Sequence, residues 1–162
     1  MKNKSMTNIV WLAVMSLVGI PEREECSNES STVGTVANGI RPYTAEAAIT
    51  TRYLLVQKGA ADNGVIINSA TARPLGVCLD EPLSGNKTAV ALLGCSAGTL
   101  KVRANGAIAA GAMVFTTAGG KVGAWSAGSY LVGRALTAAA ADGDLVEADH
   151  LLPLLAPTAT TF

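Results

Sequence analysis

Short apolar runs separated by turn residues are the feature that most constrains the fold of this chain. From Thr50 onward, runs rich in β-branched and apolar residues alternate with turn signals, which recur about every 8 to 12 residues. None of the runs keeps the 3.6-residue apolar period of a helix. The pattern predicts an all-β sandwich or barrel. The expected strands span residues 51–58, 65–68, 74–79, 88–93, 99–103, 112–117, 121–124, 129–136 and 144–150.

The turns between these runs have recognisable chemistry. Asp62-Asn-Gly64 and Asn105-Gly106 place Gly after Asn, a combination that tolerates positive φ and favours tight turns. Ala118-Gly-Gly120 separates two short runs and predicts a tight hairpin. Residues 137–141 are alanine-rich and are expected to form at most one helical turn, which Asp142-Gly143 would end.

The chain divides into four expected segments. Residues 1–33 combine an apolar run with a polar linker, residues 34–50 form an extended arm, residues 51–150 form the β domain, and residues 151–162 form a C-terminal tail. The apolar run, Ile9–Ile20, resembles a secretory signal, but no small-x-small cleavage site follows it. As a helix it would be about 18 Å long, short of the ~30 Å hydrocarbon core. It is either a segment that docks on a partner or an extension from an upstream translation start.

Charge is scarce and balanced. Apolar residues make up 49% of the chain and charged residues 15%, with 12 basic and 12 acidic side chains. Because such a surface favours association, we expect a stable oligomer; a monomer with an alanine-rich surface is the alternative. The basic residues are scattered from Lys2 to Arg134, whereas phosphate-backbone binders need clustered positive charge. We therefore expect no nucleic-acid partner.

Three cysteines and one histidine limit redox and metal chemistry. Cys26, Cys78 and Cys95 do not form a disulfide framework, and no CxxC pair is present to hold zinc. Cys78 and Cys95 follow apolar residues within strand-like runs, so both are predicted to be small buried thiols.

Two glycine-lysine motifs resemble a phosphate-binding loop, but neither has the residues and spacing that such a loop requires. A phosphate-binding loop needs Gly-x-x-x-x-Gly-Lys followed by Ser or Thr, but Val122 follows Gly119-Gly-Lys121. Gly85-Asn-Lys-Thr88 lacks the spacing. A lysine at a hairpin tip is also typical of carrier domains that hold a prosthetic group on lysine. Lys121 is better interpreted as a solvated turn residue, since the usual neighbours of a modified lysine are absent.

The remaining polar residues do not form a convincing catalytic or metal site. His150 beside Asp149, with Ser126 and Ser129, could suggest a hydrolase triad, but no Gly-x-Ser-x-Gly elbow is present. A cation site would draw on four acidic residues. They are Asp142, Asp144, Glu147 and Asp149. In a strand over residues 144–150 these carboxylates point to opposite faces, which favours a solvated outer face.

The order of segments resembles the phage capsid cement, or head decoration, family across residues 41–150. The segments that carry the resemblance are TAEAA (44–48), TRYLLV (51–56), GAAD (59–62), PLGVCLDEP (74–82), VALLG (90–94), IAAGAMVFTTAGGKV (108–122) and YLVGRALTAAAADGDLVE (130–147). The residues before Gly34 and the tail from Leu151 to Phe162 fall outside the family pattern.

The resemblance implies a compact β-barrel or β-tulip-like sandwich of about nine short strands with an N-terminal arm. It also implies a non-enzymatic homotrimer or other small oligomer, without catalytic, cofactor or metal residues. Such a protein binds the outer surface of the phage head, bridges major capsid subunits and stabilises the shell. It would be made in the host cytoplasm and would need no membrane. The arm is the expected contact element, with Arg41, Tyr43 and Glu46 as its anchors. The alternative is that this segment is only the strand by which the chain enters the β domain.

Two other classes of function remain open from the sequence. One is a β-rich carrier or substrate-binding module, in which Lys121 would carry a covalent group. The other is a secreted or surface-anchored bacterial β protein, which only the apolar run Ile9–Ile20 supports.

Overall fold

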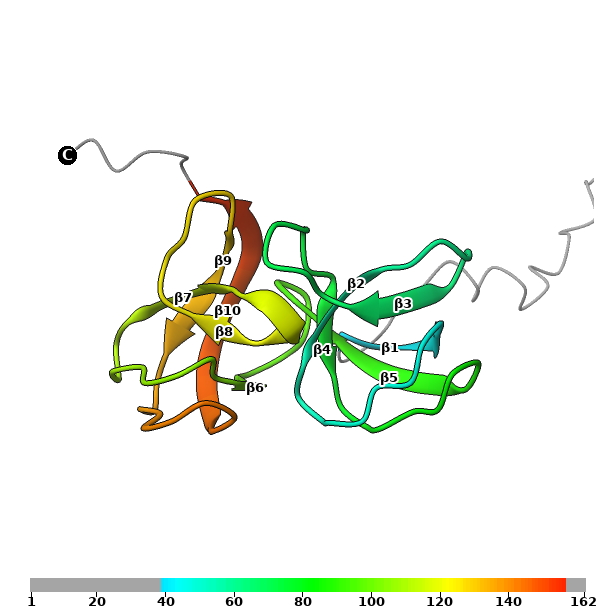
Figure 1. Ribbon diagram of the computed structural model, residues 1–162, viewed down its shortest axis with the longest axis horizontal. Helices are drawn as coiled ribbons and strands as arrows, with labels where there is room; N and C mark the ends of the chain where they lie inside the picture. The colour runs from blue at the N-terminus through cyan, green and yellow to red at the C-terminus, as the bar shows by residue number, and fades with distance from the viewer. Residues whose placement is uncertain (1–38, 157–162) are drawn as a thin grey trace, which may run out of the picture. The chain divides into compact units, whose positions relative to one another are not determined.

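The computed structural model describes residues 39–156, in which short β-strands alternate with turns and loops (Figure 1). Ten strands fall into two curled sheets, and the only other regular element in this range is a single 3-10 turn. The predicted all-β fold is confirmed. The apolar run, the polar linker, Cys26 and the last six residues lie outside the described residues.

The first sheet is a small closed barrel. Its strands are β1 (Ile40–Ala45), β2 (Leu55–Lys58), β3 (Gly64–Ile67), β4 (Gly76–Cys78) and β5 (Lys87–Leu92). Their order around the barrel is β1-β3-β2-β4-β5, and β1 closes it by pairing with both β3 and β5. Only the pairing of β1 with β3 is parallel. Closure leaves the barrel without a free strand edge.

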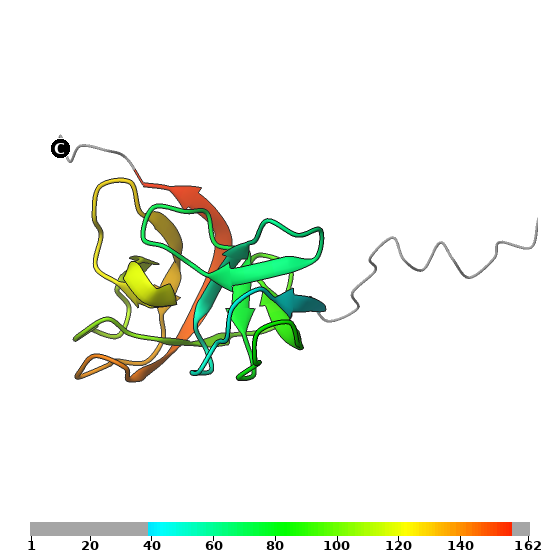
Figure 2. The same ribbon diagram turned by 45° about the vertical axis from the view of Figure 1, so that its right-hand side comes forward.

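The second sheet contains the C-terminal half of the β domain. Its strands are β6 (Leu100–Arg103), β7 (Met113–Thr116), β8 (Val122–Gly123), β9 (Tyr130–Ala135) and β10 (Leu145–Leu155), in the order β6-β10-β9-β7-β8. Figure 2 shows β10, in orange to red, running the length of this sheet. All pairings between its strands are antiparallel.

The predicted hairpin at residues 118–120 is present. The turn η2 (Ala118–Gly120) connects β7 to β8, which pair antiparallel. The helical turn considered for residues 137–141 does not form, because Ala139 forms an antiparallel bridge with Ile108. Backbone hydrogen bonds in both directions between these two residues replace the local helical bond.

Several strand boundaries differ from the expected ones. The run that begins at Thr51 becomes a strand only at Leu55, because Tyr53 has a φ of 64° and turns the chain. Residues 40–45, expected in an extended arm, form β1 and are hydrogen-bonded within the barrel. Residues 151–155, expected in the tail, continue β10 beside β9. No helix among the described residues is long and apolar enough to span a membrane.

The core has two layers that share the barrel wall. Tyr43, Val56 and Val90 pack inside the barrel, in a cluster with Cys78. Leu55, Val77 and Ala91, each next to a residue of the barrel interior, instead pack against the second sheet. Because successive strand residues face opposite sides, the shared wall is buried on both. This explains why the sequence is continuously apolar where β2, β4 and β5 form the shared wall, over residues 54–56, 76–78 and 89–93. The second sheet contributes Val102, Val114, Val122, Val132 and Val146.

The two described cysteines differ. Cys78 is fully buried in β4, as predicted, and burial raises the pKa of its thiol, which lies 3.0 Å from the Thr88 hydroxyl. The prediction of a buried Cys95 is wrong, because its side chain is exposed. β5 ends at Leu92 and Gly94 adopts a positive φ, so Cys95 lies in the loop that follows the strand.

Candidate interaction surfaces

The three residues predicted to anchor a partner differ in exposure, since Arg41 and Glu46 are half-exposed whereas Tyr43 is buried. Tyr43 is only 6% exposed, because alternate residues of β1 point into the barrel and its ring belongs to the barrel core. The Arg41 guanidinium lies 5.4 Å from the centre of that ring and donates a hydrogen bond of 3.3 Å to the Asn63 side chain. The buried ring of Tyr43 therefore holds the Arg41 guanidinium by a cation–π contact, and the Arg41 side chain remains half-exposed.

Glu46 is held inside the turn that joins β2 to β3. One carboxylate oxygen accepts a 2.8 Å hydrogen bond from the Ala61 backbone N–H. The carboxylate fills the space beside Gly59 and Gly64, where an added Cβ would lie 2.2 and 1.8 Å from its Oε1. The turn thus needs glycine at both positions to admit the carboxylate. The hydrogen bond from Ala61, assisted by the Ala60 backbone and by Lys58, lowers the pKa of Glu46 below its usual value.

The lowered pKa of Glu46 makes part of the stability pH-dependent. Because the folded pKa lies below the unfolded one, the charged carboxylate stabilises the fold above about pH 4.5, and this stabilisation is lost as pH falls through the folded pKa. We expect Glu46→Gln to lower the urea midpoint at pH 7, with the gap from the parent protein narrowing at pH 3. Urea denaturation of both proteins at pH 7 and pH 3 measures this difference in midpoint. A gap that stays constant would contradict a role for the charge.

The C-terminal end of β10 exposes four leucines in succession around Pro153. Leu151, Leu152, Leu154 and Leu155 are 41 to 60% exposed. The register of β10 against β9 shifts between His150 and Leu154, so the usual alternation is interrupted here. Leucines at odd and even positions are both exposed, and only Pro153 between them is buried. Exposed leucines at this density are unusual on a monomer and indicate an interaction surface.

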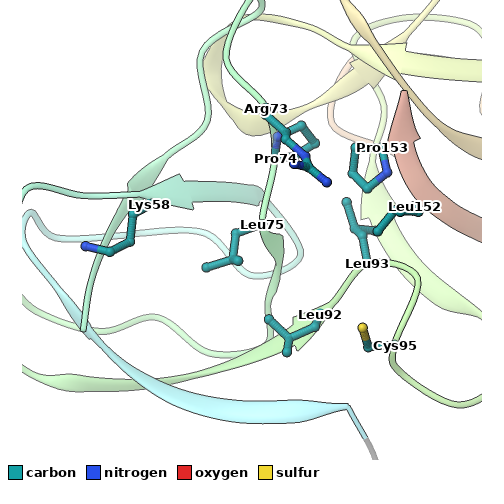
Figure 3. A pocket seen from close by; sticks show the side chains of 9 residues that line it. All are labelled: Lys58, Arg73, Pro74, Leu75, Leu92, Leu93, Cys95, Leu152 and Pro153. Atoms are coloured by element: carbon teal, nitrogen blue, oxygen red, sulfur yellow. The ribbon is translucent and has the colours of Figure 1, made fainter. Parts of the chain in front are cut away.

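An apolar groove of about 440 Å³ lies between this strand end and the barrel (Figure 3). We call it the leucine groove. Figure 3 shows Arg73 and Pro74 at one end and Cys95 at the other, with Leu152 and Pro153 along the side that β10 forms. The other lining residues are Lys58, Leu75, Leu92 and Leu93. Its walls are therefore apolar, and its only charged side chains are basic.

A second apolar groove, of about 320 Å³, lies over the second sheet. No charged residue lines it. Met113, 45% exposed, and the half-exposed Phe115 and Trp125 supply its large side chains. The remaining lining is small and apolar: Ala107, Ile108, Ala109, Ala112, Gly123 and Ala124. Aromatic and methionine side chains among small residues are typical of protein-binding surfaces.

The side chains considered as possible carrier or catalytic residues form hydrogen bonds and ion pairs within the fold. Lys121, predicted to be a solvated turn residue, forms an ion pair with Asp142 at 2.7 Å. His150 binds the loop after β5: its Nδ1 accepts a hydrogen bond from Gly94 N–H, and its Nε2 lies 3.1 Å from the Ser96 hydroxyl. Ser129 instead donates its hydroxyl hydrogen to the Ser126 carbonyl. The residues of the imagined triad therefore have separate partners.

The C-terminal acidic residues also serve local structure. Asp144 accepts hydrogen bonds from the backbone N–H groups of Ala140 and Ala141, and Glu147 accepts one from the Thr99 hydroxyl. Within residues 39–156, no three His, Cys, Asp or Glu side chains gather closely enough to hold a metal ion.

Comparison with known proteins connects this fold to a family. The model of the phage cement protein family matches residues 40–150, from the first residue of β1 to His150 of β10. The chain belongs to this family. It is therefore a structural protein of a bacteriophage capsid, as the resemblance predicted. The family match includes the barrel and most of the second sheet but stops before the exposed leucines of β10.

A solved structure supports the fold of this cement family member. The chain is similar to the N base of head fiber gp8.5 of bacteriophage phi29, with a TM-score of 0.58 and 20% sequence identity. The similarity covers 72% of this chain and 97% of that one. At this identity the likeness supports the fold alone. No curated protein matches the sequence.

The predicted contact set missed the two apolar grooves. A signal for the leucine groove was present in the sequence, since Leu151-Leu-Pro-Leu-Leu155 is an apolar run beyond the family pattern. The groove over the second sheet had no such signal. Its lining comes from two separate stretches, residues 107–115 and 123–125, which only the pairing of β7 with β8 brings together.

Proposed function

We propose that this protein is a cement protein that binds the outer surface of the phage head and stabilises it by bridging major capsid subunits. Membership of the cement family over residues 40–150 carries this proposal. The balanced, low charge of the chain supports an outer position, because a protein that faced packaged DNA would gain from clustered basic residues.

The exposed apolar surface supports self-association into a homotrimer. The leucines at the end of β10 and the uncharged groove around Trp125 present two separate apolar surfaces to solvent. One surface can join copies while another contacts the capsid. A trimer would then hold several contacts at once, and each further contact forms at high effective concentration after the first. Bridging needs such multiple attachment.

Arg41 is the proposed charged anchor to the major capsid protein, within the contact element predicted over residues 34–49. Tyr43 orients its guanidinium from the barrel core, and Glu46 stabilises the neighbouring turn. A planar guanidinium held over an aromatic ring is well suited to recognise a carboxylate or a main-chain carbonyl of a partner.

Co-sedimentation with phage heads tests the proposal. The protein is expected to pellet with expanded heads and to raise the temperature at which they release DNA. Arg41→Ala should weaken binding about tenfold while the melting temperature of the free protein changes little. Arg134→Ala, which removes an exposed arginine from β9, is the matched control. A protein that stays in the supernatant with expanded heads would contradict the function; equal binding by both variants would contradict only the anchor.

A further inference from the structure

Asparagine precedes glycine at three places in the chain: Asn38-Gly39, Asn63-Gly64 and Asn105-Gly106. Asn38 lies outside the described residues. In such a pair the glycine backbone nitrogen can attack the side-chain amide carbon of the asparagine, because glycine has no side chain to hinder the approach. A five-membered imide forms as the bond from that carbon to the amide nitrogen breaks, and the amide group leaves as ammonia with the glycine N–H proton. Water then opens the ring to aspartate or isoaspartate, and nothing is oxidised or reduced.

The loop that follows β6 leaves Asn105-Gly106 open to this reaction. Asn105 is exposed, and Gly106 has a φ of 106°. The Gly106 N–H donates no hydrogen bond to another backbone group of residues 39–156, so no such bond has to break before its nitrogen attacks. A Cβ added to Gly106 would meet no other atom within 4 Å. The loop therefore has room for the rotation that brings this nitrogen to the side-chain carbon of Asn105.

The turn between β2 and β3 holds Asn63-Gly64 in the opposite condition. The Gly64 N–H donates a 2.9 Å hydrogen bond to the Ala61 carbonyl, and Gly64 is buried as the first residue of β3. The side-chain oxygen of Asn63 accepts a 3.3 Å hydrogen bond from Arg41. Attack by the Gly64 nitrogen would have to break both bonds and turn the peptide unit out of β3. Asn63 is therefore protected, although it is exposed as Asn105 is.

We propose that Asn105 is a site of spontaneous deamidation in the folded protein and that the fold blocks the same reaction at Asn63. The product places a carboxylate beside the groove over the second sheet, which no charged residue lines. An added Cβ on Gly123, which lines that groove, would lie 3.7 Å from the Cβ of Asn105. Isoaspartate also lengthens the main chain next to Ala104, which forms a bridge with Val122. The reaction needs no capsid and no enzyme.

Peptide mapping by mass spectrometry of the full chain, aged in mildly alkaline buffer, tests this site. The three pairs fall on different tryptic peptides, because cleavage after Arg52, Lys58 and Arg103 separates them. In the folded protein Asn105 should convert about tenfold faster than Asn63, since Asn63 reacts only when its turn opens. In concentrated urea both pairs lose their structure, and the two rates should become similar. The products are recognised by the mass change from amide to acid and by separate aspartate and isoaspartate forms.

Two variants serve as matched controls. Asn105→Gln should abolish conversion in the peptide over residues 104–121, which contains no other Asn, because attack on glutamine would have to close a larger ring. Asn63→Gln should leave the conversion rate of Asn105 unchanged.

Two results in the folded protein would overturn the proposal. One is conversion of Asn63 at the same rate as Asn105 or faster. The other is an Asn105 that remains an amide in the folded protein while it converts in urea, because the loop would then block the attack.

Discussion

Gly133→Ala is expected to destabilise the protein by about 4 kcal/mol or more, enough to prevent stable folding at ambient temperature. Gly133 lies in β9 opposite His150 of β10. An added Cβ would lie 2.0 Å from the carbonyl oxygen of Asp149 and 3.0 Å from the Cα of His150. Both obstacles are backbone atoms, so no rotamer change relieves the clash. β9 and β10 would have to separate at the centre of the second sheet.

Gly123→Ala in β8 is the matched control for this effect. Its Cβ would lie 3.0 Å from the methyl group of Thr117, and the nearest backbone atom would be the Asn105 carbonyl oxygen at 3.8 Å. A side chain can move where a carbonyl cannot, so we expect a loss of about 1 kcal/mol or less. Urea denaturation of both variants measures the difference. Equal midpoints would show that β9 and β10 are not in close contact at Gly133.

Asp80→Ala is expected to cost about 2 to 4 kcal/mol, because it leaves buried donors without an acceptor. One carboxylate oxygen of Asp80 accepts the Thr88 hydroxyl hydrogen, and the other accepts a 3.2 Å hydrogen bond from Ala89 N–H. Thr88 is 2% exposed and also contacts the buried Cys78 thiol. Removing the carboxylate therefore disrupts the connection between the end of β4 and the start of β5, on which barrel closure depends.

Glu81→Ala removes the neighbouring carboxylate and serves as the control. Glu81 is exposed, and its only ion pair among the described residues is a 3.6 Å contact with the exposed Arg52. Pairs of this kind contribute between zero and about 1 kcal/mol. Thermal unfolding of the two variants compares them directly. A small loss for Asp80→Ala would mean that water replaces the carboxylate as acceptor.

The sequence predicted the second sheet and most of the barrel well, because their strands carry local signals. Turn residues bound each run, and every predicted strand overlaps an observed one. The main omission was β1. Ile40–Ala45 contains Pro42 and stands alone between polar stretches, so nothing in its neighbourhood marks it as a barrel strand. Its pairing partners, β3 and β5, lie about 20 and 50 residues further along the chain.

The exposure of individual side chains could not be predicted from residue type. Cys95 was predicted to be buried because it follows an apolar run, and Tyr43 was predicted to contact a partner because it is an aromatic residue on the expected arm. The positive φ of Gly94 turns Cys95 outward, and the closure of the barrel turns Tyr43 inward. The orientations of these two side chains depend on backbone conformation and strand pairing, which the neighbouring residues alone do not determine.

The fold class and the family follow from the sequence alone, because strand length, turn chemistry and segment order are local properties of the chain. The surfaces available to a partner were decided only by the tertiary structure. Barrel closure buries Tyr43 and leaves Arg41 half-exposed, while the end of β10, where the register with β9 shifts, exposes four leucines. Exposure depends on which distant segments cover a residue, and that is settled by strand pairing across the whole domain.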